Sequence, residues 1–188
     1  MNKVKRFLLR FVSILPWKQS AVELDQVFQT IGEYVLLFQQ LESQIDQALL
    51  IWWGTENWTQ SQRRLEKLSF AAKLSRLKDE FKANPGNQRG RERPEWPGRF
   101  EALLNRLDAE REHRNSLVHS AYLFEAFEHG GPIIQSDRVR RQGEVQFDQT
   151  QWTQEYQAQQ LKRVRALLTD LGQCRVQIIH DLAAMEQQ

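Results

Sequence analysis

Three side chains with complementary chemistry lie close together in the stretch Glu110–Tyr122, which reads EREHRNSLVHSAY. Asn115 and His119 are four residues apart, so in a helix they share one face, and Arg114 lies one step around the same turn. A guanidinium binds two phosphate oxygens at once, and an imidazole moves a proton near neutral pH. This spacing favours phosphate chemistry, with Arg114, Asn115 and His119 as candidate catalytic residues.

The order Arg114-Asn115-Ser-Leu-Val-His119 resembles the R-x4-6-H motif, with a polar residue directly after the Arg, of the HEPN superfamily of small all-helical domains. The surroundings are similar too. A long helical segment carries the motif, a Gly-Gly-Pro break and a hairpin-like stretch follow it, and an earlier helix carries Phe38-x-x-Leu-Glu42. Many HEPN proteins are metal-independent ribonucleases of toxin–antitoxin, abortive-infection and CRISPR-associated systems. The resemblance covers most of the chain, and only the Arg114 to His119 segment is diagnostic.

The resemblance implies a metal-independent endoribonuclease in a toxin–antitoxin or anti-phage role, with RNA as substrate and an antitoxin or regulatory protein as a further partner. In this family two motif helices from two protomers face each other, which implies a homodimer with one composite site. His119 would then move the proton of the RNA 2′-hydroxyl, and Arg114 would hold the phosphate. Asn115 would orient either the phosphate or His119. Glu110, Glu42 and Tyr122 are the candidate supporting residues.

Two other interpretations stay open. In the plainer one, Arg114 pairs with Glu110 four residues earlier, and His119 is a surface residue. In the other, the chain is a non-catalytic HEPN-like module that binds RNA, a nucleotide or a protein, and it meets a membrane through its N-terminal helix. An open basic groove beside Arg114 and His119 favours the enzyme, whereas burial of both residues favours the binding module.

Composition sets broad limits. The chain has 188 residues, 40% of them hydrophobic and 27% charged, with a net charge of +2, which is typical of one soluble domain that tolerates RNA binding. Cys174 is the only cysteine, so no intrachain disulfide can form and a reducing cytoplasm is expected. His113, His119 and His129 lack the spacing of metal ligands, and no nucleotide-binding loop is found. We therefore predict no metal and no cofactor.

Residues 1–18 are predicted to form a separate amphipathic helix that ends at Pro16. Lys3, Arg6 and Arg10 fall on one face of it, and four apolar residues fall on the other. The apolar run is far shorter than the ~20 residues of a membrane-spanning helix. This helix packs on its own domain or a second copy, or it lies at a membrane surface, the less favoured alternative.

Residues 19–188 are predicted to form the HEPN-like domain. Apolar residues at three- and four-residue steps predict one helix from Ala21, after the capping box Ser20-Ala-Val-Glu23, to about Trp53, and another over residues 59–81. The Pro- and Gly-rich residues 84–98 are predicted to be a basic loop. There, Arg93 and the nearby Arg99 are candidates for binding RNA phosphates, although a solvated loop explains them equally well.

The motif helix is predicted to run from Arg99 to Phe124 or Phe127 and to stop at the Gly-Gly-Pro sequence. Residues 132–148 then predict a small hairpin, with strands 133–141 and 144–148, whose Arg138, Arg140 and Arg141 are further candidates for RNA binding. A last helix starts after Thr150 or Thr153. The expected fold is all-α: an antiparallel bundle of four long helices with a hairpin insert after the motif helix.

Overall fold

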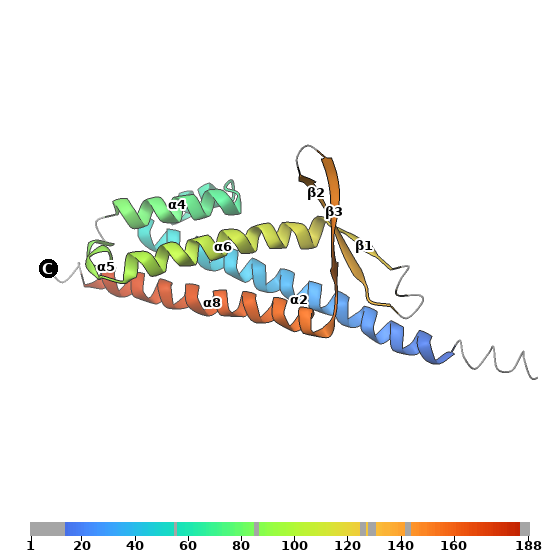
Figure 1. The fold of residues 1–188 in the computed structure, drawn as a ribbon. Coiled ribbons are helices and arrows are strands. Elements are labelled where there is room, and N and C mark those ends of the chain that lie inside the picture. Colours follow the sequence, from blue (N-terminus) through green and yellow to red (C-terminus); the bar gives the residue numbers. More distant parts are fainter. Residues whose placement is uncertain are drawn as a thin grey trace, which may run out of the picture. The chain divides into compact units, whose positions relative to one another are not determined.

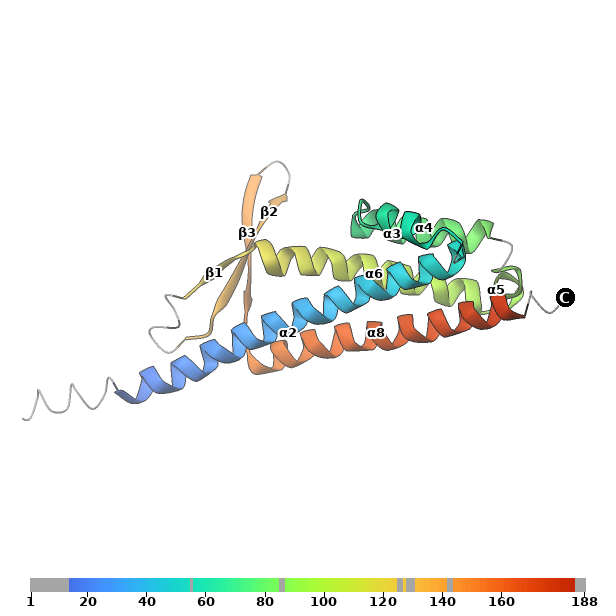
Figure 2. The same cartoon turned by 180° about the vertical axis from the view of Figure 1, so that it is seen from behind.

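The computed structural model describes residues 14–54, 56–84, 87–124, 127, 131–141 and 144–184. These residues are mostly helical and include a small three-stranded antiparallel sheet (Figures 1 and 2). The elements are α2 (Ile14–Trp53), α3 (Trp58–Leu65), α4 (Phe70–Ala83), α5 (Gln88–Glu92), α6 (Trp96–His119), β1 (Ala121–Leu123), β2 (Ile134–Arg141), β3 (Glu144–Gln151) and α8 (Gln154–Ala183). The expected helical architecture is confirmed. Most of the predicted N-terminal helix, residues 1–13, lies outside the described part of the chain.

Helix α2 runs unbroken from Ile14 to Trp53, so the predicted helix end at Pro16 and helix start at Ala21 are wrong. Pro16 lies in the first turn, where a proline breaks no hydrogen bond within the helix. The predicted end at Trp53 is confirmed. Gly54 follows with a φ of 77°, a left-handed conformation that glycine adopts without steric cost.

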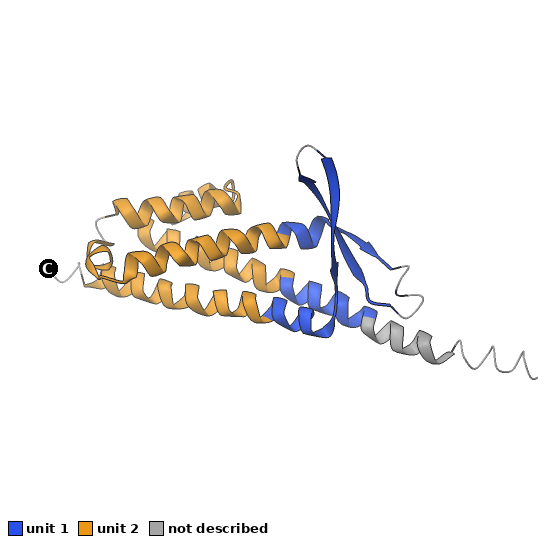
Figure 3. Ribbon diagram, viewed as in Figure 1, with its two compact units in different colours: residues 1–34, 115–161 blue, residues 35–114, 162–188 orange. Residues whose placement is uncertain are grey.

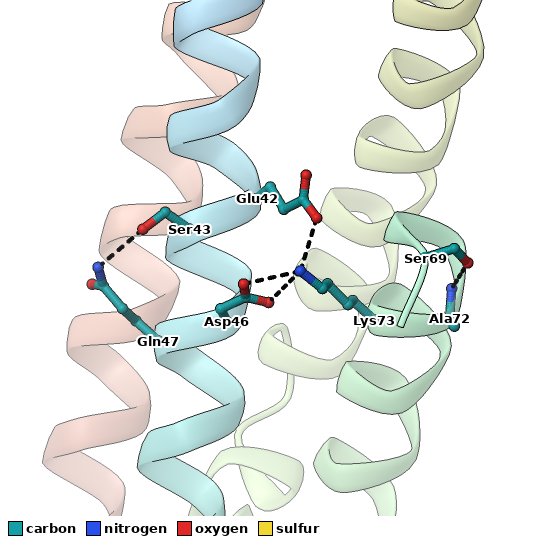
Figure 4. A network of polar contacts seen from close by, with 7 residues as sticks. All are labelled: Glu42, Ser43, Asp46, Gln47, Ser69, Ala72 and Lys73. Atoms are coloured by element: carbon teal, nitrogen blue, oxygen red, sulfur yellow. Dashed lines mark hydrogen bonds and ion pairs between the residues drawn. The ribbon is translucent and has the colours of Figure 1, made fainter. Parts of the chain in front are cut away.

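The predicted single helix over residues 59–81 is two helices, α3 and α4. A turn separates them, and Ser69 begins the second as its N-cap because its hydroxyl accepts a hydrogen bond from the Ala72 amide at 3.2 Å (Figure 4). Leu65 and Phe70 are buried on either side of this turn. The apolar spacing therefore continues across a break that is set by a side-chain cap.

The predicted loop 84–98 is partly helical, because it contains α5 and the first turn of α6. Two side chains hold its backbone. Asn87 is buried, accepts a hydrogen bond from Trp52 Nε1 at 3.1 Å and donates one to the Glu80 carbonyl at 3.3 Å. Arg91 donates hydrogen bonds to carbonyls of residues 81 and 84. The loop is thus a well-packed connection in which side chains satisfy backbone polar groups.

Helix α6 ends at His119, so the predicted extension to Phe124 or Phe127 is wrong. The next residues form β1, which pairs antiparallel with β2 over Ala121–Leu123, and β2 pairs with β3 from Ile134 to Arg141. The predicted hairpin is confirmed and gains a third strand. Three residues are too few to show a strand period, so only pairing with β2 defines β1.

Helix α8 begins after Thr153, one of the two predicted N-caps, whose hydroxyl accepts a hydrogen bond from the Tyr156 amide at 3.1 Å. Its buried stripe follows three- and four-residue steps: Val164, Leu167, Leu171, Cys174 and Ile178. Burial raises the pKa of the Cys174 thiol to about 12, which keeps it a neutral part of this stripe. No helix in the described ranges combines the length and apolarity that crossing a membrane requires.

The chain divides into two compact units (Figure 3). Unit 1 contains residues 1–34 and 115–161, which include the sheet. Unit 2 contains residues 35–114 and 162–188. In unit 2, segments of α2, α6 and α8 run alongside one another, and the stacked rings of Phe81 and Phe100, 4.2 Å between centroids, join α4 to α6. The division falls inside α6, directly after Arg114.

Candidate functional site

Arg114, Asn115 and His119 all lie on the last turns of α6, as the sequence predicted for a helical motif. Arg114 is the last residue of this helix in unit 2, whereas Asn115 and His119 belong to unit 1. Asn115 is partly buried and His119, the final residue of the helix, is exposed. An exposed imidazole at a helix end is accessible to a substrate in solution, so its position meets the first requirement for proton transfer.

Arg114 is half-buried in unit 2 and lies over an aromatic side chain. Its guanidinium carbon is 5.8 Å from the centroid of the Phe38 ring, and Phe38 packs against Phe70 with 4.8 Å between ring centroids. A guanidinium above an aromatic face is attracted by the ring, and packing limits its rotamers. Phe38 therefore restrains the direction of the predicted phosphate-binding side chain. The earlier helix predicted to accompany the motif supplies this contact.

In unit 1, the end of α6 is attached to the sheet by a polar network that the sequence analysis missed. The hydroxyls of Ser116 and Ser120 both lie within hydrogen-bonding distance of Asp137 Oδ1 on β2. Gln135 Nε2 also donates to Ser116 Oγ at 2.9 Å and to Asp137 Oδ2 at 3.2 Å. These bonds fix the helical turn that carries His119 relative to the sheet. The sequence offered one signal for this network. Ser116 and Ser120 are four residues apart and so share a helix face, and Gln135 and Asp137 are two residues apart and so share a strand face.

The same network continues to the start of α8. Trp152 Nε1 donates a hydrogen bond to Gln135 Oε1 at 3.0 Å, and Gln157 Nε2 donates one to the Trp152 carbonyl at 3.2 Å. Thr30 on α2 donates to Gln157 Oε1 at 2.9 Å. All four side chains are buried. Because each of these four buried side chains has a hydrogen-bond partner, the network can order unit 1 while compensating the cost of desolvation.

Tyr122, a predicted supporting residue, lies on β1 and closes the end of α6. Its hydroxyl donates a hydrogen bond to the Leu117 carbonyl at 2.7 Å, which is one of the last carbonyls of the helix and lacks a helical partner. Its ring packs 6.1 Å from that of Trp152. Burial raises the pKa of Tyr122 beyond its usual range, so the hydroxyl stays a donor. A direct part in catalysis stays a prediction.

Glu110, the second supporting residue, is 2% exposed in unit 2. Its carboxylate accepts two hydrogen bonds from Arg163 on α8, at 2.6 Å from Nε and 3.2 Å from the terminal nitrogen. This forked arrangement is among the stronger ion pairs in proteins. Both residues line a cavity of about 250 Å³, together with His113. Glu110 thus joins α6 to α8, and its support of Arg114 stays a prediction.

Glu42, the third supporting residue, contacts a lysine of unit 2 (Figure 4). Lys73 Nζ lies 2.8 Å from Glu42 Oε1 and 2.9 Å from each carboxylate oxygen of Asp46. The side chain of Lys73 is only 6% exposed. Burial raises the pKa of the Asp46 carboxyl, and the nearby ammonium opposes this shift. This cluster of one cation and two carboxylates joins α2 to α4, and a role of Glu42 toward Arg114 stays a prediction.

Arg93 and Arg99, two of the predicted RNA-binding residues, both line an open cavity of about 450 Å³ in unit 2 with Trp96 and Gln177. Arg93 forms an ion pair with Asp181, which is 3% exposed. The guanidinium of Arg99 lies 6.0 Å from the centroid of the Trp96 ring. The charge of Arg93 is therefore partly neutralised by Asp181, whereas Arg99 is exposed above the Trp96 ring.

The other predicted RNA-binding residues lie on β2 and divide between its two sides. Arg138 and Arg140 are opposite Phe147 and Val145 of β3, so these four side chains point to one face of the sheet. Arg141 points to the other face, where it forms an ion pair of 2.7 Å with Asp148. The three arginines are therefore not one cluster. Alternation along the strand, applied to the sequence, predicts this division.

In the described ranges, the His, Cys, Asp and Glu side chains form no group of three that could hold a metal ion. We also compared the chain with protein-family models, with curated proteins and with solved structures, and it matches none of them. The case for function therefore depends on the residues of α6, the cavity at Trp96 and the sheet.

Proposed function

We propose that this chain is a metal-independent endoribonuclease of HEPN type whose reacting groups are Arg114, Asn115 and His119. One observation carries the proposal: the Arg-Asn pair and the His fall on consecutive turns at the end of α6, with His119 exposed. The HEPN-like bundle, formed by the four longest helices of the described chain, α2, α4, α6 and α8, is part of the same proposal.

The reaction uses the nucleophile that RNA carries. His119 accepts the proton of the 2′-hydroxyl, and the 2′-oxygen then bonds to the adjacent phosphorus as the bond from phosphorus to the 5′-oxygen breaks. The leaving 5′-oxygen takes a proton. Arg114 neutralises the charge that grows on the phosphate, and Asn115 donates a hydrogen bond that orients it. The products are a 2′,3′-cyclic phosphate and a 5′-hydroxyl, and DNA resists because it lacks the nucleophile.

Two proton transfers are needed, whereas each chain supplies one His119. A homodimer that brings two copies of Arg114, Asn115 and His119 to one cleft supplies both the base and the acid. We therefore propose a two-fold composite site, acting on RNA in the cytoplasm in a toxin–antitoxin or anti-phage role. An antitoxin or regulatory protein would hold such an activity in check.

The test is incubation of the purified chain in EDTA with a tRNA and with an unstructured RNA, beside the Arg114→Ala and His119→Ala variants. We expect the parent to cleave one or both RNAs and leave cyclic phosphate ends, and each variant to lose at least about a hundredfold in rate, a typical contribution of acid–base catalysis. Matched controls are His180→Ala and Arg89→Ala, which remove exposed residues of the same types on α8 and α5. Equal cleavage by the parent and by His119→Ala would refute the proposal.

The second candidate is a non-catalytic module that binds RNA or a nucleotide. The observation that favours it is the open cavity in unit 2, where Trp96 offers a ring for stacking and Arg99 a cation for phosphate. In this case no RNA is cleaved, and Trp96→Ala weakens binding of a fluorescent nucleotide while Trp58→Ala, at another partly exposed tryptophan, does not. The membrane contact proposed with this candidate involves residues outside the described part of the chain.

A further inference from the structure

The two faces of the sheet carry opposite charge. Residues directly opposite in an antiparallel pair share a face, and neighbours along a strand alternate between faces. The acid-free face is formed by Arg138, Arg140, Val145 and Phe147. The acidic face is formed by Asp137, Val139, Arg141, Glu144, Gln146 and Asp148. The first face has two arginines and no carboxylate, whereas the second has one arginine and three carboxylates.

Part of the acidic face makes contacts within unit 1, whereas Glu144 and Gln146 are exposed. Asp137 accepts hydrogen bonds from Ser116 and Ser120 at the end of α6, and Arg141 is paired with Asp148. Tyr122 of β1 is opposite Gln135, so it lies on this side too, and its hydroxyl reaches the Leu117 carbonyl. The end of this side that carries Gln135 and Asp137 is therefore turned toward α6.

The acid-free face is open to solvent. Phe147 is 62% exposed and Val145 is 41% exposed, and both Arg138 and Arg140 are exposed. Within the described part of the chain, neither of these two arginines has a carboxylate partner. A phenylalanine exposed to this extent contributes little to the packing of unit 1, and exposed apolar side chains that cluster often mark binding surfaces.

We propose that the acid-free face binds single-stranded RNA, with a base stacked on the Phe147 ring and phosphates held by Arg138 and Arg140. The proposal rests on the ribonuclease function above and assigns the conformation of the RNA that this function acts on. An exposed aromatic ring flanked by cations matches the two components that single-stranded nucleic acid offers, unpaired bases and phosphates. In a duplex, the bases are already stacked and do not reach such a ring.

Charge also argues against a second copy of the same face as the occupant. Face-to-face pairing of two copies brings four arginines together without one carboxylate, and like charges across an interface cost free energy. RNA carries negative phosphates, so its contact with the same arginines is electrostatically favourable. Arg138 and Arg140 lie two residues apart on one strand, roughly 7 Å, so each can neutralise a different phosphate of one strand. Phe147 lies directly opposite Arg138, which places the ring beside a cation.

The first test measures binding separately from cleavage. Fluorescence anisotropy of a labelled short oligouridine is recorded in EDTA with the His119→Ala chain and with the same chain carrying Phe147→Ala or Phe147→Tyr. We expect Phe147→Ala to weaken binding roughly five- to hundredfold, the range measured for loss of one stacked base, and Phe147→Tyr to retain it. Because the ring is mostly exposed, circular dichroism should show unchanged folding for both variants.

The second test uses salt. The Arg138→Gln/Arg140→Gln double variant should lower the slope of the logarithm of the binding constant against that of salt concentration by about 0.7 for each lost phosphate contact. The matched control is Arg141→Gln, which removes the same charge from the next residue on the acidic face. We expect its slope and affinity to equal those of the parent.

Several results would overturn the proposal: no binding of oligouridine by the parent, equal loss for Arg141→Gln and the double variant, or tighter binding of a duplex than of a single strand. A change from dimer to monomer in Phe147→Ala, with unchanged RNA affinity, would assign the face to a protein contact instead. The two proposals fail separately. Binding that depends on Phe147 without any cleavage by the parent refutes the ribonuclease alone, whereas cleavage that depends on His119 but not on Phe147 refutes the sheet site alone.

Discussion

Two cations of unit 2 are paired with carboxylates, whereas the two arginines of the acid-free face have no carboxylate partner within the described part of the chain. In unit 2, Lys73 lies between Glu42 and Asp46, and Arg163 is bound to the buried carboxylate of Glu110. On the acid-free face, Arg138 and Arg140 extend from β2 opposite Phe147 and Val145, respectively. The sequence contains both groups in similarly basic stretches. The difference shows that the count of arginines says little about binding, because a carboxylate partner decides which cations are available to a ligand.

The largest effect is expected where a cation is most deeply buried. Lys73→Met removes the ammonium but keeps most of the volume, and it leaves Asp46 and Glu42 side by side without their cation. We expect the free energy of unfolding at pH 7 to fall by about 3 kcal/mol, the lower end of the range for broken buried pairs, because the two carboxylates that remain are partly exposed. Urea denaturation followed by circular dichroism measures it.

The pH dependence of this loss gives a control. Burial raises the pKa of Asp46, and Lys73 opposes that shift, so removal of the lysine raises this pKa further. A carboxyl whose pKa is higher in the folded state than in the unfolded state destabilises the fold as pH rises above its unfolded value of ~4. The difference between the parent and Lys73→Met should therefore be largest at neutral pH and should shrink as pH falls toward 4. A difference independent of pH would mean that packing, and not charge, is lost.

Unit 1 should depend instead on a hydrogen-bond network that contains no cation. Gln135→Met, at a side chain that is 1% exposed, removes the acceptor of Trp152 Nε1 and the donor to Ser116 and Asp137. Buried groups left without partners cost about 1–3 kcal/mol each, so we expect a loss of roughly 2–3 kcal/mol. Hydrogen exchange should show the loss in β2 and the last turn of α6. Equal loosening of α4, in unit 2, would contradict a network confined to unit 1.

The elements that the sequence predicted well are those whose pattern is local. The long helices ending at Trp53 and beginning after Thr153 follow from apolar spacing and a capping residue. The break before Ser69 was missed because apolar residues continue at three- and four-residue steps through Leu65, Leu68 and Ala72, and only the side-chain cap marks the break. Strand β1 was missed because its three residues are defined by a partner strand that lies further along the chain, beyond the Gly-Gly-Pro break.

The candidate site was likewise predictable only where its pattern is local. Arg114, Asn115 and His119 could be selected from spacing within one helix. Their surroundings could not, because the contacts of Ser116 with Asp137 and of Glu110 with Arg163 join residues 21 and 53 positions apart. Distant contacts depend on register and helix packing, which periodicity does not report. The division of Arg138 and Arg140 from Arg141 is the exception, since alternation along one strand is enough to predict it.

The smallest effect is expected at the acid-free face, and it tests the comparison most directly. Arg138→Gln/Arg140→Gln should change the free energy of unfolding by no more than about 0.5 kcal/mol, because exposed side chains away from buried contacts contribute little to stability. Arg163→Gln makes the same chemical change in unit 2, where the 2% exposed carboxylate of Glu110 loses its forked partner, and it should cost about 3 kcal/mol. Urea denaturation of both variants under one condition gives the contrast. Equal losses would mean that Arg138 and Arg140 hold the sheet together, and a cation used for folding is not available for RNA. Unchanged stability together with weaker RNA binding would separate folding from recognition at these two residues.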